Sequence, residues 1–304
     1  MRHELAAAAP AAQTAGIPQD LRALVDDYLA NLRFARRELA VRGLEDAMRY
    51  SLLAGGKRIR PVLALATARA LGRDPSEVLP IAAALELIHT FSLIHDDLPA
   101  LDDDDLRRGL PTSHQRFGED VAILAGDALY AEAFRLVLRE QPGDPARVLA
   151  AGAELADATG TDGMVGGEYL DVRDYAGAGV VDLRRVHRMK TGRLIAASVE
   201  CVLLLDGGPE EALTDFRAFA GELGVLFQIV DDILDVTATD SELGKRTGSD
   251  ERLGKLTYVS RHGLAGARAL AGEAHAKARA ALRRAAPGAA DLEQVTDFVL
   301  TRSS

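Results

Sequence analysis

The feature that most constrains the fold is the helical spacing of the apolar residues. Between residues 20 and 32, apolar side chains such as Leu21, Leu24 and Tyr28 recur every three or four positions, which is the spacing of one face of an α-helix. Asp20 is expected to cap this helix. Ala and Leu supply most of the apolar residues and there is no Trp, which favours helices over strands. The sequence therefore predicts an all-α protein.

The same periodicity continues along the chain, and Gly and Pro interrupt it at the ends of the predicted helices. We expect a polar loop at 99–118, a flexible N-terminal tail at 1–18, and one domain at 19–304. This domain would be a bundle of roughly ten or more helices around a central apolar cavity. Further helices are predicted at 44–53, from Pro61, at 75–98, 121–140, 144–159, 164–173, 183–205, 209–238, 263–286 and 290–300.

Charge and composition exclude several classes of protein. The net charge of −10 argues against a nucleic-acid partner, because binding to a phosphate backbone requires a basic face. The single cysteine, Cys201, excludes an internal disulfide and fits a cytoplasmic protein. No segment reaches about 18 uncharged apolar residues, so we expect no transmembrane helix.

Two aspartate clusters follow strongly apolar helices. The first contains Asp96, Asp97 and 102–105, and the second contains Asp231, Asp232 and Asp235. Asp231 and Asp235 lie four residues apart and so share a helix face, where like charges repel. Asp96 and Asp97 lie at the C-terminal end of a predicted helix, where the macrodipole disfavours carboxylates. These clusters do not favour folding unless cations bind, and carboxylate oxygens suit Mg²⁺. The alternative is a solvated acidic loop and an acidic helix end.

Basic residues accompany the acidic clusters, as a site for a diphosphate and Mg²⁺ requires. Taken singly, each of these residues is typical of an exposed surface charge. The candidate groups are Lys57, Arg58 and Arg60; Arg107 and Arg108; Lys190 with Thr191; and Lys245 and Lys255.

The order of these motifs resembles the trans-isoprenyl diphosphate synthase family, which includes the farnesyl and geranylgeranyl diphosphate synthases. GGKRIRP, LIHDDLPALDDDDLRRGLPT, GMVGG, KTG, FQIVDDILD, GKRTGSD and GKLTY occur in the family's order. The first acidic motif resembles the bacterial form, DDxxxxD. The resemblance covers about residues 20–300 and implies a helical fold of the isoprenoid synthase type.

The resemblance also implies an activity. Isopentenyl diphosphate would condense with an allylic diphosphate, dimethylallyl or geranyl, in a reaction that depends on about three Mg²⁺ ions. Asp96 and Asp102 would hold two ions, and Asp231 a third, supported by Asp235.

The family also implies which residues bind the two substrates. Arg107, Lys190 and Lys245 would bind the allylic diphosphate, and Thr191 and Gln228 would line the reacting centre. Isopentenyl diphosphate would be bound by Gly56, Lys57, Arg60, His89 and Arg108.

Two positions bear on specificity. The family often has Gln where this chain has Glu168; this carboxylate either pairs with a lysine or lies outside the site. Phe91 lies five residues before Asp96, about 7.5 Å along a helix, and Ser92 lies four before. In the family an aromatic residue at the fifth position accompanies a farnesyl product. We therefore expect farnesyl diphosphate, with geranylgeranyl diphosphate as the alternative; otherwise Phe91 only packs in the core.

Two other functions remain open. A class I terpene cyclase would share the fold, but DDILD and the basic GKRTGSD segment favour a synthase. A non-catalytic subunit of a heteromeric synthase would be expected to lack one of these motifs. The family is typically homodimeric, so a homodimer is expected. The sequence does not decide the preferred allylic primer.

Overall fold

The computed structural model describes residues 16–34, 39–174, 183–208, 210–238 and 257–302. Its described elements are helical except for a β-hairpin whose two strands have two residues each. This confirms the prediction of an all-α bundle. The helices of the N-terminal half are α1 (Gln19–Asn31), η1 (Leu39–Val41), α2 (Arg42–Leu52), α3 (Ile59–Ala70), η2 (Pro75–Val78), α4 (Leu79–Asp96), α5 (Ser113–Phe117) and α6 (Glu119–Glu140). The remaining elements are β1 (Leu106–Arg107), β2 (Leu110–Pro111), α7 (Pro145–Thr159), α8 (Met164–Asp174), α9 (Leu183–His187), η3 (Arg188–Gly192), α10 (Arg193–Asp206), α11 (Glu210–Thr237), α14 (Tyr258–Ala285) and α15 (Ala290–Thr301).

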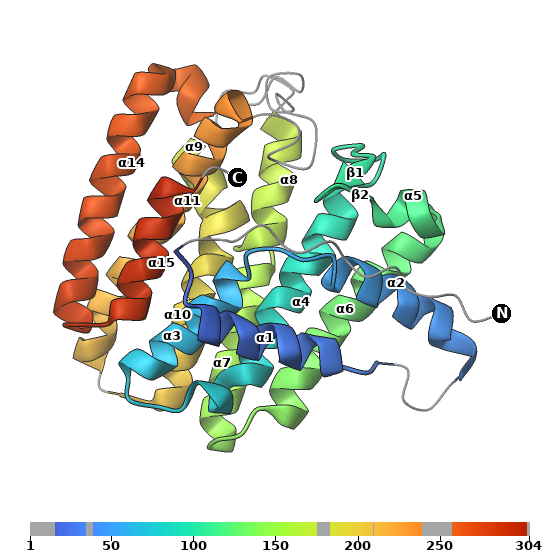
Figure 1. Ribbon diagram of the computed structural model, residues 1–304, viewed down its shortest axis with the longest axis horizontal. Coiled ribbons are helices and arrows are strands. Elements are labelled where there is room, and N and C mark those ends of the chain that lie inside the picture. The colour runs from blue at the N-terminus through green and yellow to red at the C-terminus, as the bar shows by residue number, and fades with distance from the viewer. Residues whose placement is uncertain (1–15, 35–38, 175–182, 209, 239–256, 303–304) are drawn as a thin grey trace.

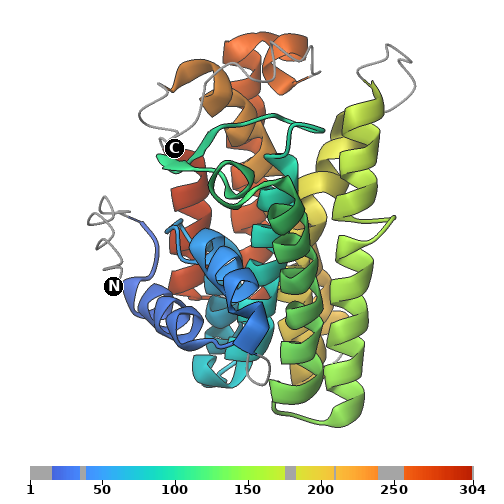
Figure 2. The ribbon, with the colours of Figure 1, turned by 90° about the vertical axis from the view of Figure 1, so that its right-hand side faces the viewer.

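Helix α4 lies in the centre of the bundle (Figure 1). It packs against α3, α6 and α10, and its side chains Leu85, Leu87 and Ile88 have no exposed surface. A helix that is apolar on all sides is stable only when neighbouring helices cover it. The C-terminal end of α4 reaches the end of the bundle where β1 and β2 lie, as Figures 1 and 2 show.

Helix α4 together with the preceding turn is the one described segment, Pro75–Asp96, that is long and apolar enough to cross a membrane. Because 67% of its most apolar window is buried inside the bundle, the same composition is explained by its place in the core.

The N-terminal helix begins differently from the prediction. Helix α1 starts at Gln19 after Pro18, and no side chain caps it. The prediction that Asp20 is the cap is therefore wrong. Asp20 lies in the first turn and forms an ion pair with Arg69 at 2.5 Å. Ile17, within the segment predicted to be a tail, is 1% exposed.

Two later segments also depart from the predicted helices. The helix predicted from 263 begins at Tyr258, because Thr257 and Ser260 form a capping box there, and Gly263 adopts a φ of 70° inside it. The helix predicted at 183–205 is interrupted by a single π-helical turn, η3. Such turns occur frequently at functional sites.

The segment 99–118 contains more structure than the predicted polar loop. It forms the hairpin of β1 and β2, in which Leu106 pairs with Pro111, and then the short helix α5. The Tyr50 hydroxyl donates a hydrogen bond of 2.8 Å to the Pro111 carbonyl oxygen. This contact fixes the hairpin against α2.

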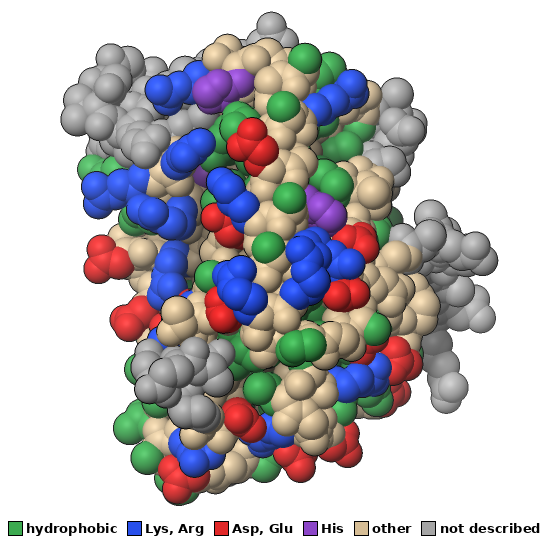
Figure 3. Space-filling model, turned by 90° about the vertical axis from the view of Figure 1, so that its left-hand side faces the viewer, with side chains coloured by type: hydrophobic (Ala, Val, Ile, Leu, Met, Phe, Trp, Pro, Cys, Tyr) green, Lys and Arg blue, Asp and Glu red, His purple; other side chains and the backbone are tan. Residues whose placement is uncertain are grey.

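Charge is unevenly distributed over the surface. Figure 3 shows the face on the α14 side of Figure 1, where Lys and Arg side chains gather in the upper and middle part. Helix α14 alone contributes exposed basic residues at 261, 268, 277, 283 and 284. Basic side chains are therefore concentrated on this part of the surface, although the chain as a whole has a net negative charge.

Candidate active site

The first acidic motif folds back on the end of α4. Asp96 is the last residue of α4, and the backbone N–H of Asp102 donates to the Asp96 carbonyl oxygen at 2.9 Å. The N–H of Asp104 likewise donates to the Asp97 carbonyl oxygen at 3.3 Å. The loop therefore brings Asp102 beside Asp96, as a shared ligand role requires.

The aspartates of this motif divide into two groups. Asp97 is 3% exposed and accepts hydrogen bonds from Arg107 Nε at 2.7 and 2.9 Å. Asp104 is also buried and lies 3.7 Å from Arg107 Nη2. These two carboxylates hold Arg107 in place. Asp103 and Asp105 are exposed, and Asp105 accepts a hydrogen bond of 2.9 Å from Gln115 Nε2. Asp96 and Asp102, which the family resemblance assigns to metal binding, are half-buried.

Asp96 lies in a crowded anionic environment. Burial raises the pKa of Asp96 to about 7, Glu168 and Asp102 add to the rise, and Lys190 and Arg107 oppose it. An added cation would stabilise the charged form of a carboxyl group whose pKa is raised in this way. The carboxylates present on this wall therefore fit Mg²⁺.

Lys190 connects α8 to the π-helical turn. Its Nζ lies 2.7 Å from Glu168 Oε2 and 2.6 Å from Asp171 Oδ2. Burial alone would lower the pKa of Lys190, but the two carboxylates raise it above its usual value. The open question about Glu168 is answered by this geometry: Glu168 pairs with a lysine of the site. Thr191, the neighbour of Lys190 in η3, is half-buried.

The second acidic motif lies on α11. Asp231 Oδ1 is 2.7 Å from Arg302 Nη2, which approaches from the end of the chain. Asp232 is 2% exposed and accepts hydrogen bonds from Gln228 Nε2 at 2.8 Å and from the Tyr258 N–H at 2.7 Å. Asp232 thus joins α11 to α14, whereas Asp231 and Asp235, on one helix face, are half-buried and remain as candidate ligands.

A cluster of basic side chains around Phe227, called the basic pocket below, lies beside Asp231. The Arg60 and Arg302 guanidinium groups lie 5.8 and 4.1 Å from the ring centre of Phe227. Their Nε atoms are buried and make no hydrogen bond within the described part of the chain. Burial lowers the pKa of Lys57 to about 8, and the nearby Arg302 contributes to the lowering. These crowded cations indicate a site for an anion.

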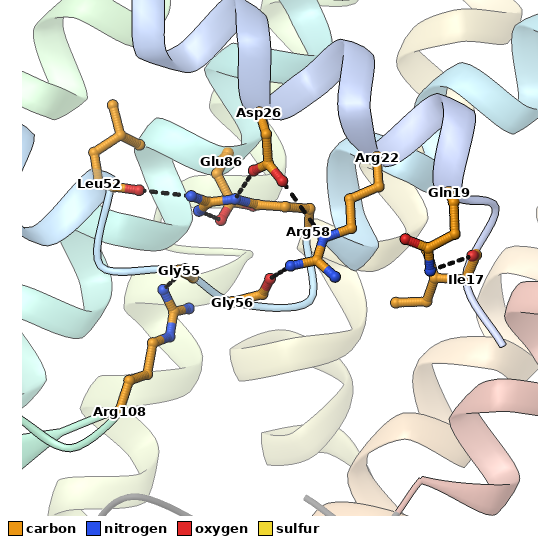
Figure 4. Close-up of polar contacts among 10 residues, drawn as sticks. All are labelled: Ile17, Gln19, Arg22, Asp26, Leu52, Gly55, Gly56, Arg58, Glu86 and Arg108. Atoms are coloured by element: carbon orange, nitrogen blue, oxygen red, sulfur yellow. Dashed lines mark hydrogen bonds and ion pairs between the residues drawn. The ribbon is translucent and has the colours of Figure 1, made fainter. Parts of the chain in front are cut away.

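His89 and Arg108 complete this basic pocket. Burial and the surrounding arginines, of which Arg60 contributes most, hold the pKa of His89 well below its usual value. The guanidinium of Arg108 donates to the Gly55 carbonyl oxygen (Figure 4). Gly56 has a φ of 124°, and a Cβ there would lie 2.7 Å from the Arg108 guanidinium carbon. The Arg108 side chain could move away from such a Cβ, but other residues rarely adopt this φ, so the backbone conformation favours glycine here.

Arg58 belongs to the same sequence motif but not to the pocket. It adopts a left-handed φ of 53°, and its Nη1 lies 2.6 Å from Glu86 Oε1 (Figure 4). It also contacts Asp26 at 3.0 Å and donates to the Leu52 carbonyl oxygen at 2.8 Å. Arg58 therefore fixes the motif to α1, α2 and α4, with Lys57 on one side and Arg60 on the other.

Within the described residues, no three His, Cys, Asp or Glu side chains gather closely enough to hold a metal ion on their own. Mg²⁺ in phosphate sites is usually bound through one or two carboxylates, with waters and substrate phosphates as further ligands. The two carboxylates of each acidic motif, Asp96 with Asp102 and Asp231 with Asp235, suit this mode of binding. Lys245 and Lys255 lie outside the described residues.

Comparison with known proteins assigns the chain to a family. The polyprenyl synthetase family model matches residues 41–298. The chain belongs to the polyprenyl synthetase family. The resemblance inferred from the sequence motifs and the prenyltransferase class are thereby confirmed.

The relatives of this polyprenyl synthetase carry two product names. It is 44% identical over 265 residues to a farnesyl diphosphate synthase of Geobacillus stearothermophilus, covering 85% of this chain and 88% of that protein. It is 47% identical over 243 residues to the large subunit 1 of a heterodimeric geranylgeranyl pyrophosphate synthase of Arabidopsis thaliana. That match covers 78% of this chain and 66% of the plant protein.

Comparison with solved structures points to the same kind of protein. A crystal structure of a Helicobacter pylori geranyltransferase, described as complexed with magnesium and isoprenyl diphosphate, superposes with a TM-score of 0.81 at 32% identity. The superposition covers 93% of this chain and 94% of that one. The prediction of an isoprenoid synthase fold is confirmed.

The residues predicted to limit chain length lie below the acidic end of α4. Phe91 makes edge-to-face contacts with His95 and with Tyr130 of α6, at centroid distances of 4.9 and 5.3 Å. The Ser92 hydroxyl donates to the His89 carbonyl oxygen at 3.0 Å. Phe91 is thus part of an aromatic wall between α4 and α6.

Sequence reasoning missed two residues of this site. Arg302 lies beyond the last predicted helix, 290–300, and belongs to no motif, so only the packing of α15 reveals it. Asp171 carried a usable signal, because it lies three residues after Glu168 and therefore shares its helix face.

Proposed function

We propose that this protein is a magnesium-dependent short-chain prenyl diphosphate synthase that joins isopentenyl diphosphate to an allylic diphosphate. The observation that carries the proposal is the presence of two cationic sites of different character. Lys190 and Arg107 lie among carboxylates, whereas Lys57 and Arg60 lie against aromatic rings. A diphosphate that arrives with cations suits the first, and one without cations suits the second.

We place the allylic diphosphate between the two acidic motifs. Mg²⁺ bound by Asp96, Asp102, Asp231 and Asp235 would neutralise the charge that develops on the departing diphosphate. Lys190 and Arg107 donate hydrogen bonds to the same group. The allylic C–O bond breaks, the diphosphate leaves with the electron pair, and the charge of the allylic cation is left facing the Thr191 and Gln228 side chains.

We place isopentenyl diphosphate in the basic pocket, held by Lys57, Arg60, His89 and Arg108, with Gly56 allowing close approach. Its double bond attacks the allylic cation and forms the new C–C bond. A proton is then lost to the released diphosphate. This sequence requires no protein nucleophile.

We propose farnesyl diphosphate as the product, because Phe91 places an aromatic ring below Asp96. Geranylgeranyl diphosphate is the second candidate, favoured by the several plant relatives that bear this name. The test is incubation of the purified protein with Mg²⁺, isopentenyl diphosphate and each allylic primer, followed by separation of products by chain length. A farnesyl product supports the proposal; a cyclic hydrocarbon, or no product, contradicts it.

A terpene cyclase and a non-catalytic subunit receive less support. The basic pocket for a second diphosphate has no purpose in a cyclase that uses one substrate. A non-catalytic subunit would have no reason to keep both acidic motifs. The cytoplasmic location remains a prediction, and several plant relatives are named as chloroplastic.

We also propose a homodimer formed through α6, α7 and α8. These adjacent helices expose large apolar side chains at Leu124, Leu138, Leu149 and Tyr169, which are 56%, 58%, 64% and 60% exposed. Patches of exposed apolar side chains mark interaction surfaces. Light scattering should give twice the monomer mass for the native chain and the monomer mass for Leu138→Asp, with Leu24→Asp on α1 as the control.

A further inference from the structure

Lys190 is held by two carboxylates from one helix face. Glu168 and Asp171 reach its Nζ at 2.7 and 2.6 Å, and both carboxylates are more than four-fifths buried. One carboxylate is enough to neutralise a lysine, so the second needs a reason.

Gly167 lets α8 lie directly against the turn that carries Lys190. A Cβ at Gly167 would lie 2.2 Å from the Lys190 backbone nitrogen and 2.6 Å from the Lys190 Cα. The backbones of α8 and η3 therefore touch. The side chain that follows Gly167 lies within reach of the lysine ammonium.

The identity of residue 168 changes the charge of this contact. A glutamine, which has the same length, would offer Lys190 a neutral carbonyl oxygen in place of a carboxylate. Hydrogen bonds in which the groups are charged are about twice as strong as neutral ones. With Glu168, Lys190 must break two ion pairs to reach a diphosphate, and it leaves a carboxylate beside Asp96 when it moves.

We propose that Glu168 is a positioning residue that restrains Lys190 and so makes binding of the allylic diphosphate depend on divalent cations. Cations that arrive with the diphosphate compensate the carboxylate that Lys190 leaves, whereas a metal-free diphosphate brings no compensation. The inference rests on the proposed function, since it concerns the site of the allylic diphosphate.

The test is calorimetric titration of inorganic diphosphate into the native protein and into Glu168→Gln, in EDTA and in saturating Mg²⁺. We expect Glu168→Gln to bind diphosphate about three- to tenfold more tightly in EDTA, the range for loss of one partly buried ion pair. In Mg²⁺ the two proteins should differ less than about twofold. Glu154→Gln is the matched control, because Glu154 pairs with Arg193 at 2.9 Å on another helix pair, and it should leave both affinities unchanged.

A cycle with Lys190→Met separates restraint of the lysine from simple repulsion. If Glu168 acts through Lys190, Glu168→Gln should improve affinity in EDTA less in the Lys190→Met background than in the native protein. A gain of the same size in that background would overturn the inference, as would equal binding by the native and Glu168→Gln proteins in EDTA. If Glu168→Gln binds diphosphate more weakly than the native protein in Mg²⁺ but not in EDTA, Glu168 would be a metal ligand, which would also overturn the inference. Failure of the native protein to bind diphosphate even with Mg²⁺ would instead contradict the proposed function.

Discussion

Replacing Phe91 with alanine should lengthen the product by one isoprenyl unit. In the folded protein the Phe91 ring is held by His95 on its own helix and by Tyr130 on α6. It therefore stands as a fixed wall one to two turns below Asp96. Alanine removes the ring and leaves the backbone of α4 in place.

The expected change follows from helix geometry. One turn of α4 rises about 5.4 Å. An isoprenyl unit adds four carbon–carbon bonds of roughly 1.5 Å each, and because the bonds zigzag they advance an extended chain by about 5 Å. One turn below Phe91, Leu87 and Ile88 are fully buried and form the next barrier. The variant should therefore shift from farnesyl to geranylgeranyl diphosphate and stop there.

The assay is product analysis with dimethylallyl, geranyl and farnesyl diphosphates as primers. Phe117→Ala is the matched control, because Phe117 makes a similar edge-to-face contact with Tyr50 at 5.3 Å away from α4. The two lost ring contacts and the new space cost Phe91→Ala about 2–4 kcal/mol, so its folding is checked by circular dichroism. A farnesyl product from the variant, or a geranylgeranyl product from the native protein, would refute the role of Phe91.

Three further predictions concern charge. The Michaelis constant for isopentenyl diphosphate should rise above pH 8, where Lys57 with its pKa of about 8 loses its proton, and Lys57→Arg should abolish this rise in pH-dependent kinetics. Arg58→Met should lower the free energy of unfolding in urea by about 3–5 kcal/mol, because it leaves Glu86 buried without its partner; Arg58→Met with Glu86→Leu should recover most of the loss. Burial raises the pKa of Glu154 to about 7, above its value in the unfolded chain, so the stability of the native protein should fall as pH rises from about 4.5 to 7. The melting temperature of Glu154→Gln minus that of the native protein should therefore increase by a few degrees over this range. A difference in melting temperature that does not change with pH would contradict this prediction.

The helices were predictable because burial of one face imposes a spacing that the sequence displays. Short segments lack such a signal. The hairpin and α5 within 99–118 depend on contacts such as that between Tyr50 and Pro111, which join positions far apart in the chain. The start of α14 was missed because its capping box, Thr257 and Ser260, uses a serine where the usual signal is Glu or Gln.

The site was predictable to the level of its motifs. Residue type and order indicated Asp96, Asp231, Lys57 and Lys190, but not how neighbouring charges are divided. Lys57 and Arg58 are adjacent in the sequence, yet Arg58 turns to Glu86 because the left-handed backbone at 58 directs it into the bundle. Which charges meet depends on tertiary packing.

If the proposed function is correct, the division of charges would let the site treat the two diphosphates differently. Arg107 and Lys190 already form ion pairs with carboxylates. A diphosphate can bind them only by replacing those carboxylates, and this exchange changes the binding free energy little unless added cations pair with the released carboxylates. Arg60 is instead held against Phe227 with its Nε buried and without a hydrogen bond in the described structure. An anion there satisfies a donor that folding has left without a partner, and it needs no metal to do so. Under the proposed function, the same fold would provide one position that couples binding to cations, where a bond must break, and one that only holds its substrate.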